Sequence, residues 1–209
     1  MAYPVYTIDP YALTSVAAVK EHLNIPDANT TQDNIITRMV NSASQMIETY
    51  LDRKILRRQY TEYYDGRGND RFLVREWPVE KPTELWLDST STFTDVTKKY
   101  DLDEYEVDGE PAIGVTLLSG RRFAKGTRNI KVIYYAGYTV TPAVIHEAAI
   151  LFTEFMYDMK TDRRIGVSSK GKNAESTTFL GDLPDFVKNM LAPYQRMEFP
   201  SSHVGVQNF

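Results

Sequence analysis

The sequence predicts an α+β protein, mainly a helical bundle formed by the N- and C-terminal helices, with an inserted antiparallel β-rich subdomain. Apolar residues recur at helical spacing near both ends of the chain, and the middle changes to short strand-like runs. One long stretch without periodicity separates the last two helices. We therefore expect a helical core over residues 1–57 and 137–197, a β insertion over 58–136, a flexible loop over 161–181 and a tail over 198–209.

The first two helices are predicted from their caps and their apolar stripes. Thr14 is a candidate N-cap for a short helix that Pro26 ends. The second helix is longer, because the polar stretch 29–33 offers caps and an apolar stripe follows it at spacings of three and four residues. It should stop near Asp52. The stripe consists of Ile36, Met39, Val40, Ala43, Met46, Ile47, Tyr50 and Leu51.

The hydrophobic period changes from Arg58 onward, where short runs rich in Tyr, Val, Leu and Trp alternate with Gly, Asp and Pro. The dipeptides at 65–66 and 108–109 are Asp-Gly turn signals, while Pro78 and Pro82 favour edge or loop positions. The insertion should therefore be antiparallel with short connections. Strands are expected at 59–64, 71–74, 84–87, 104–107, 115–118 and 129–135.

Helical periodicity returns at Thr141 and Pro142, which suit an N-cap and a first helical position, and a broad apolar face follows them. Residues 161–181 lose the period and are rich in Gly, Ser, Thr, Asn and Lys, a composition that predicts a mobile loop. A last short helix should run from Pro184 to Met190 or Leu191. Its inward residues are expected to be Phe186, Val187 and Met190.

Composition and charge exclude several classes of function. The formal net charge is −4, so no overall basic field would hold duplex DNA tightly. The chain contains no Cys, which removes disulfides, thiolate metal sites and Cys nucleophiles. It also has no apolar run of about 18 residues and no recognisable export signal at its start, so no membrane partner is expected.

The sequence gives no support for catalysis. His146-Glu147 begins like the helix of a zinc protease, but Ile150 occupies the position of the second histidine ligand. No P-loop, no GxGxxG after a strand and no GxSxG elbow is present. We therefore expect no catalytic, cofactor-binding or metal-binding residue, and no enzymatic activity. Basic clusters at 121–125, 163–164 and 170–172 could face nucleic acid or an acidic partner, or could be solvated loops.

Both ends of the chain carry short patterns of apolar residues, Pro and Tyr that are typical of one family. At the start these are Leu13-Thr14 through Val19-Lys20, Leu23 to Ile25, and a helix ending Ile47-Glu48-Thr49-Tyr50-Leu51. Towards the end they are Ile130–Tyr135, Gly137-Tyr138, Pro142-Ala143-Val144-Ile145, Arg164, Leu183-Pro184-Asp185-Phe186-Val187 and Leu191-Ala192-Pro193-Tyr194-Gln195-Arg196. In order and spacing they resemble the head–tail connector proteins of tailed bacteriophages, also called head-completion or adaptor proteins. The stretch from about Lys81 to Asp103 and the tail after Arg196 depart from the pattern.

The resemblance implies a structural protein of the virion, assembled in the host cytoplasm and placed in the head–tail connector region. Its copies would form a ring, expected to be twelvefold, beneath the portal protein. The ring would extend the DNA channel, touch the genomic DNA transiently and offer a docking platform to the next neck or tail-completion protein. No cofactor is implied.

The resemblance also suggests where the partners bind. The C-terminal helix and tail would dock on the portal, with candidates Phe186, Met190, Tyr194, Arg196 and Phe199. The loop would face the lumen or a neighbouring subunit through Arg163, Arg164, Lys170 and Lys172. Two alternatives remain: a nucleic-acid-binding module of a phage or prophage, with salt-dependent affinity for DNA, and a hydrolytic enzyme with a site built from Asp and Glu.

Overall fold

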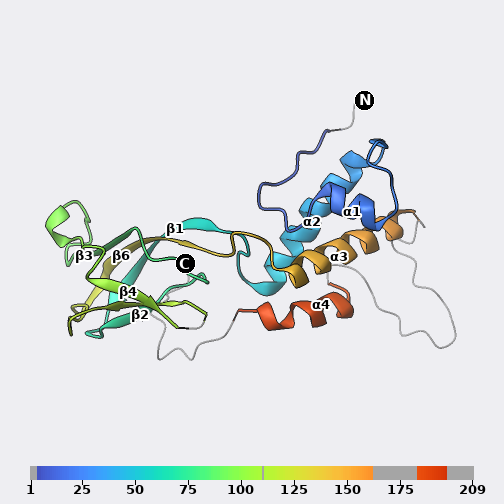
Figure 1. Ribbon diagram of the computed structural model, residues 1–209. Helices are drawn as coiled ribbons and strands as arrows, with labels where there is room; N and C mark the ends of the chain where they lie inside the picture. The colour runs from blue at the N-terminus through green and yellow to red at the C-terminus, as the bar shows by residue number, and fades with distance from the viewer. Residues whose placement is uncertain (1–3, 110, 162–182, 197–209) are drawn as a thin grey trace. The chain divides into compact units, whose positions relative to one another are not determined.

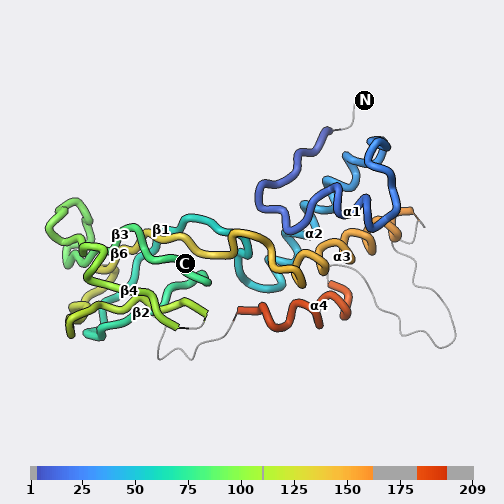
Figure 2. Tube along the Cα trace, viewed as in Figure 1, coloured from blue at the N-terminus to red at the C-terminus, as the bar shows by residue number. Residues whose placement is uncertain are grey.

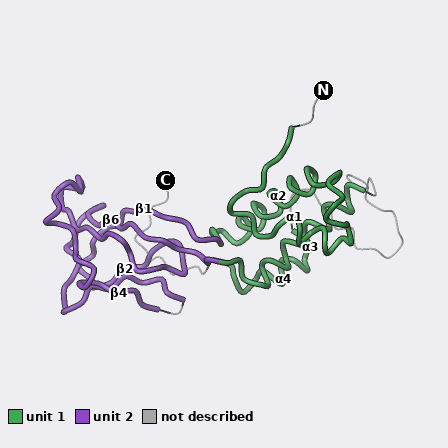
Figure 3. Tube along the Cα trace, turned by 45° about the horizontal axis from the view of Figure 1, so that its top comes forward, with its two compact units in different colours: residues 1–55, 140–196 green, residues 56–139, 197–209 purple. Residues whose placement is uncertain are grey.

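The computed structural model describes residues 4–109, 111–161 and 183–196, which form four α-helices and six β-strands (Figure 1). The mixed α+β class is confirmed. The expected predominance of a helical bundle is not, because the chain also forms two three-stranded antiparallel sheets. Figure 3 shows two compact units: unit 1 takes its residues from 1–55 and 140–196, and the described part of unit 2 comes from 56–139.

Unit 1 begins with α1 (Val16–His22) and α2 (Asp33–Leu51). The N-cap of α1 is Ser15, whose hydroxyl accepts a hydrogen bond from the Ala18 N–H, so the expectation of Thr14 as the cap was wrong by one residue. Helix α2 ends where Asp52 adopts a left-handed conformation, with φ of 50°.

The remaining helices of unit 1 are α3 (Ala143–Thr161) and α4 (Asp185–Leu191), followed by the 3-10 turn η2 (Ala192–Tyr194). Helix α3 begins at Ala143, and the Pro142 carbonyl accepts its first helical hydrogen bond, from the His146 N–H, so Pro142 occupies the N-cap position. The expectation of Thr141 as the cap and Pro142 as the first helical residue was wrong by one residue. Helix α2 packs against α1 and α3, and α4 packs on α3, as the chain trace in Figure 2 shows. One core cluster of this unit contains Val19, Ile36, Val40 and Ile150.

Unit 2 contains all six expected strands, with small shifts at their ends. They are β1 (Arg58–Gly66), β2 (Arg71–Leu73), β3 (Glu84–Leu87), β4 (Tyr105–Asp108), β5 (Gly114–Leu117) and β6 (Gly126–Ala136). One sheet has the order β1-β6-β3 and the other the order β2-β5-β4, with every pair antiparallel. Buried residues from both sheets share one core, including Val132 and Tyr134 of β6 and Val115 and Leu117 of β5.

A buried polar network fixes the inner face of the β1-β6-β3 sheet. The Glu62 carboxylate accepts hydrogen bonds from the hydroxyls of Tyr64 and Tyr134, at 2.7 Å for Tyr134. Each hydroxyl also accepts a backbone N–H, from Arg75 at 3.0 Å and from Glu76 at 3.3 Å. Burial raises the pKa of both tyrosines, so they stay protonated and keep donating.

A second polar centre organises the loop after β3. The Asp88 side chain is fully buried and accepts hydrogen bonds from the side chains of Thr90, Thr92 and Lys98 and from the backbone of Thr90 and Phe93. The Lys98 ammonium lies 2.8 Å from the carboxylate. These donors hold the pKa of Asp88 well below its usual range, with Lys98 the largest cause.

Replacing Asp88 with Asn should lower the melting temperature of unit 2, because the amide cannot pair with Lys98 and places donors where acceptors are needed. A depressed pKa stabilises the fold above the unfolded pKa of about 3.9, and this contribution is lost as the pH falls below that value. The difference in melting temperature between wild type and Asp88→Asn should therefore shrink as the pH falls below about 4. A difference that stays constant down to pH 3 would contradict this.

A buried hydroxyl joins the start of the chain to α2. The Ser44 Oγ accepts the N–H of Leu13 at 2.9 Å and donates to the Val40 carbonyl at 2.8 Å. We expect Ser44→Ala to destabilise unit 1 by about 1–3 kcal/mol, because the buried Leu13 N–H loses its partner. Chemical denaturation measures the change. Ser42→Ala, an exposed position on the same helix, is the control and should cost less than about 0.5 kcal/mol.

Candidate functional site

Three of the proposed portal-binding residues form one stripe along α4 and η2. Phe186, Met190 and Tyr194 follow one another at intervals of four residues, the spacing that places side chains on one side of a helix. The adjoining side of α4, about 100° around the helix, carries Val187 and Leu191, both fully buried. We call Phe186, Met190 and Tyr194 the α4 stripe.

The expectation that Phe186 points into the core was wrong. Its side chain is 46% exposed, whereas Leu183, Val187 and Leu191 supply the buried contacts of this helix. Position 186 lies about 100° around the helix from position 187, so both residues cannot occupy the centre of the same buried face. Met190 and Tyr194 are half-buried. The α4 stripe therefore offers an exposed aromatic ring next to two partly covered side chains.

Arg196 is engaged within unit 1. Its Nε lies 2.6 Å from the Asp52 carbonyl oxygen and 3.0 Å from an Asp52 carboxylate oxygen, and its backbone N–H donates to the Leu51 carbonyl. The arginine thus satisfies carbonyl groups at the C-terminus of α2, where a cation also suits the helix dipole. Arg196 thereby attaches the residues after η2 to the C-terminus of α2.

The other predicted site residues lie outside the described part of the chain. These are Phe199 in the tail and the four loop cations Arg163, Arg164, Lys170 and Lys172.

The outer face of the β1-β6-β3 sheet carries a row of rings and cations that was not anticipated from the sequence. Tyr63, Lys131 and Trp86 are directly opposite one another on the three strands. Lys131 Nζ lies 5.5 Å from the centroid of the Trp86 ring. The guanidinium of Arg128 lies 5.2 Å from the centroid of the Tyr63 ring, and the Phe93 ring, tilted by 50° to that of Tyr63, has its centroid 5.4 Å away. Alternation within each strand indicated the outward positions, but only the register brings them together.

Two of the three histidines, His22 and His146, make side-chain contacts within unit 1, and His203 lies outside the described residues. His146 Nε2 lies 3.2 Å from the Thr14 hydroxyl, and His22 Nε2 lies 3.0 Å from a Glu154 carboxylate oxygen. Within the described ranges, no group of three or more His, Asp or Glu residues could hold a metal ion. In the same part of the chain, no helix has both the length and the apolar character needed to span a membrane.

Known proteins resemble this chain in sequence and in fold. The model of the head completion protein family matches residues 12–197. Among curated proteins there is no significant match. A chain from the neck of an empty GTA particle, solved with C6 symmetry, has a TM-score of 0.59 and 15% identity and covers 97% of this chain and 100% of its own length. A chain from the neck of the native particle, solved with C12 symmetry, gives the same values.

A third similar structure comes from the virion of a native gene transfer agent particle, with a TM-score of 0.59, 16% identity and coverage of 94% of this chain and 96% of its own. At these identities the structures show a shared fold, while the family model spans most of the sequence. The family model confirms the resemblance that the terminal motifs suggested. The family is a class of structural proteins, which is not an enzyme class. The chain belongs to the head completion protein family.

Proposed function

We propose that this protein is a head–tail connector of a phage or phage-like particle. Its copies form a ring beneath the portal at the head–tail junction of the virion, extend the DNA channel and present a docking platform for the next neck or tail protein. The observation that carries this proposal is the family match over residues 12–197. The likeness in fold to neck chains of particles solved with sixfold and twelvefold symmetry supports a ring.

In this proposal the α4 stripe binds the portal. Exposed aromatic side chains surrounded by partly buried neighbours are typical anchors of protein interfaces, because they add apolar contact area at little conformational cost. Phe186 has this character, and Met190 and Tyr194 extend the same surface over two further turns. Arg196 supports the site indirectly, since its bonds to Leu51 and Asp52 hold the end of the stripe against α2.

Phe186→Ser tests this role without disturbing the core, because about half of the ring is already in solvent. We expect affinity for the cognate portal protein to fall by tenfold or more, equivalent to about 1.4 kcal/mol, while the melting temperature stays close to that of wild type. Co-sedimentation with assembled portal measures the binding. Val144→Ser, at a 41% exposed position on α3, is the matched control. Equal binding by the two variants would remove the α4 stripe from the portal interface.

A second candidate function is contact with DNA through the outer face of the β1-β6-β3 sheet. Rings interleaved with cations suit nucleic acid, because bases stack on rings while ammonium and guanidinium groups neutralise phosphates. Lys131 Nζ lies 5.5 Å from the centroid of the Trp86 ring and 6.0 Å from that of Phe93. Trp86 is buried, so Tyr63, 42% exposed, is the ring of the row on which a base would stack. In a connector this face would make passing contacts with the genome, and in a separate binding module it would give measurable affinity.

If this face binds DNA, Lys131→Gln should weaken the binding of the assembled protein to a DNA fragment and reduce its salt dependence by about one phosphate contact. A gel shift at about 50 and 200 mM salt reads out both effects. Lys188→Gln on α4 removes the same charge from unit 1 and serves as the control. Identical shifts for wild type and both variants would exclude the face as a DNA site.

A further inference from the structure

The N-terminal arm, residues 4–11, is attached to α2 by two asparagine side chains. Asn34 accepts the Tyr6 N–H at 2.7 Å and donates to the Pro4 carbonyl at 3.0 Å. Asn41 repeats the pattern, accepting the Asp9 N–H at 2.9 Å and donating to the Thr7 carbonyl at 2.8 Å. Each carboxamide therefore pairs with the backbone on both sides of one arm residue, Val5 for Asn34 and Ile8 for Asn41.

The spacing of the two asparagines matches the geometry of the arm. Seven helical residues from Asn34 to Asn41 rise about 10.5 Å. In a regular β-strand an offset of three residues would turn these backbone groups to opposite edges, whereas a polyproline II-like arm repeats every three residues and rises about 3.1 Å per residue. Three such residues from Val5 to Ile8 span about 9 Å, so the two carboxamides meet equivalent backbone groups of the arm. This arrangement uses the backbone of the arm for attachment and leaves the side chains of Val5, Tyr6 and Ile8 exposed.

The exposed side chains at the start of the arm are large and mostly apolar. Val5 is 85% exposed, Ile8 44% and Tyr6 40%. Three such residues within four positions make an apolar ridge of a kind that marks an interaction site on a protein surface. Ordering an extended segment costs conformational entropy, and here the asparagines hold it in place before any partner arrives.

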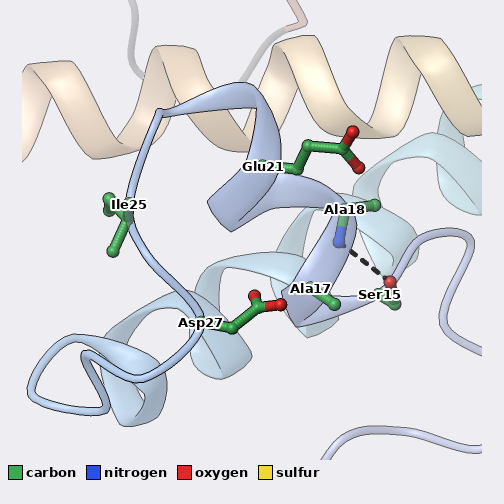
Figure 4. A pocket seen from close by; sticks show the side chains of 6 residues that line it. All are labelled: Ser15, Ala17, Ala18, Glu21, Ile25 and Asp27. Carbon is green, nitrogen blue, oxygen red and sulfur yellow. Dashed lines mark hydrogen bonds between the residues drawn. The ribbon is translucent and has the colours of Figure 1, made fainter.

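A hollow with matching chemistry lies beside α1 in the same unit. It has a volume of about 460 Å³ and is lined by Ser15, Ala17, Ala18, Glu21, Ile25 and Asp27 (Figure 4). The two alanines and Ile25 provide apolar surface, and the carboxylates of Glu21 and Asp27 can accept hydrogen bonds from tyrosine hydroxyls. Its volume falls in the range of clefts that bind ligands.

We infer that the arm of one copy docks into the α1 hollow of a second copy, so that each subunit clasps its neighbour. This inference rests on the proposed ring. A closed ring is built from one heterologous contact, which requires two different and complementary surfaces on every copy. Two such surfaces are the ridge of Val5, Tyr6 and Ile8 and the hollow of Ala17, Ala18 and Ile25. Between them, the Tyr6 hydroxyl donates a hydrogen bond to the carboxylate of Glu21 or Asp27.

The absence of cysteine from the sequence allows a direct cross-linking test. Thr7→Cys on the arm keeps the side chains of Val5, Tyr6 and Ile8, and Ala17→Cys lies in the hollow. The two single-cysteine chains, carrying tags of different size, are mixed, assembled with the cognate portal protein and oxidised. A mixed disulfide is expected, since the inference brings the two positions within the ~7 Å that a disulfide requires between Cα atoms. Gln45→Cys, exposed on α2, replaces Ala17→Cys as the control and should give no mixed product.

The outcomes separate this inference from the proposed function. A portal-bound ring without the mixed disulfide, or with equal product from the Gln45→Cys control, would overturn the clasp and leave the connector role standing. A chain that joins neither the portal nor other copies would overturn both.

Releasing the arm provides an independent test. The double variant Asn34→Asp, Asn41→Asp keeps the size of both side chains but removes the amide donors and places charge next to the Pro4 and Thr7 carbonyls. We expect ring assembly to require at least a tenfold higher protein concentration, with unchanged helical circular dichroism. Ser42→Ala on the same helix is the control. Assembly at the wild-type concentration by the double variant, with the arm shown to be released by proteolysis, would overturn the inference.

Discussion

The long antiparallel pairing of β1 with β6 is the constraint on which the rest of the structure depends. It runs from Arg58 opposite Ala136 to Gly66 opposite Gly126, and an isolated parallel bridge joins Leu56 and Tyr138 just outside it. Because the strands pair in this register, the chain enters and leaves unit 2 at adjacent points. A helical unit can therefore be assembled from segments as distant in sequence as α2 and α3, which pack against each other. The inserted strands and loops can vary without breaking that unit.

Helix α2 has the corresponding role inside unit 1. Its buried face packs against α1 and α3, while its polar positions attach segments that have no regular structure of their own. Asn34 and Asn41 hold the arm, Ser44 holds Leu13, and the carbonyl groups at its end receive Arg196. One helix thus positions both surfaces that the proposed connector uses, the arm at its start and the α4 stripe near its end. Partner binding at either surface would therefore depend on an intact α2.

Periodicity and turn chemistry were enough to predict every described α-helix and strand, because burial imposes a period of 3.6 or 2 residues on the sequence. They were not enough for contacts set by tertiary packing. Phe186 and Val187 are adjacent apolar residues, and only the docking of α4 decides which one is buried. Arg196 was expected to bind the portal, and no local signal in the sequence indicated its bonds to the end of α2. The asparagine attachments and the row of Tyr63, Lys131 and Trp86 depend on distant segments, for which a single sequence carries no local signal.

The central claim is that copies of this chain assemble as a ring on the portal. Native mass spectrometry of the purified protein, alone and mixed with its cognate portal, tests it most directly because it counts the copies in each complex. We expect a defined ring added to the portal, with a copy number that matches the portal symmetry. A monomer whose mass spectrum is unchanged by the portal would contradict it.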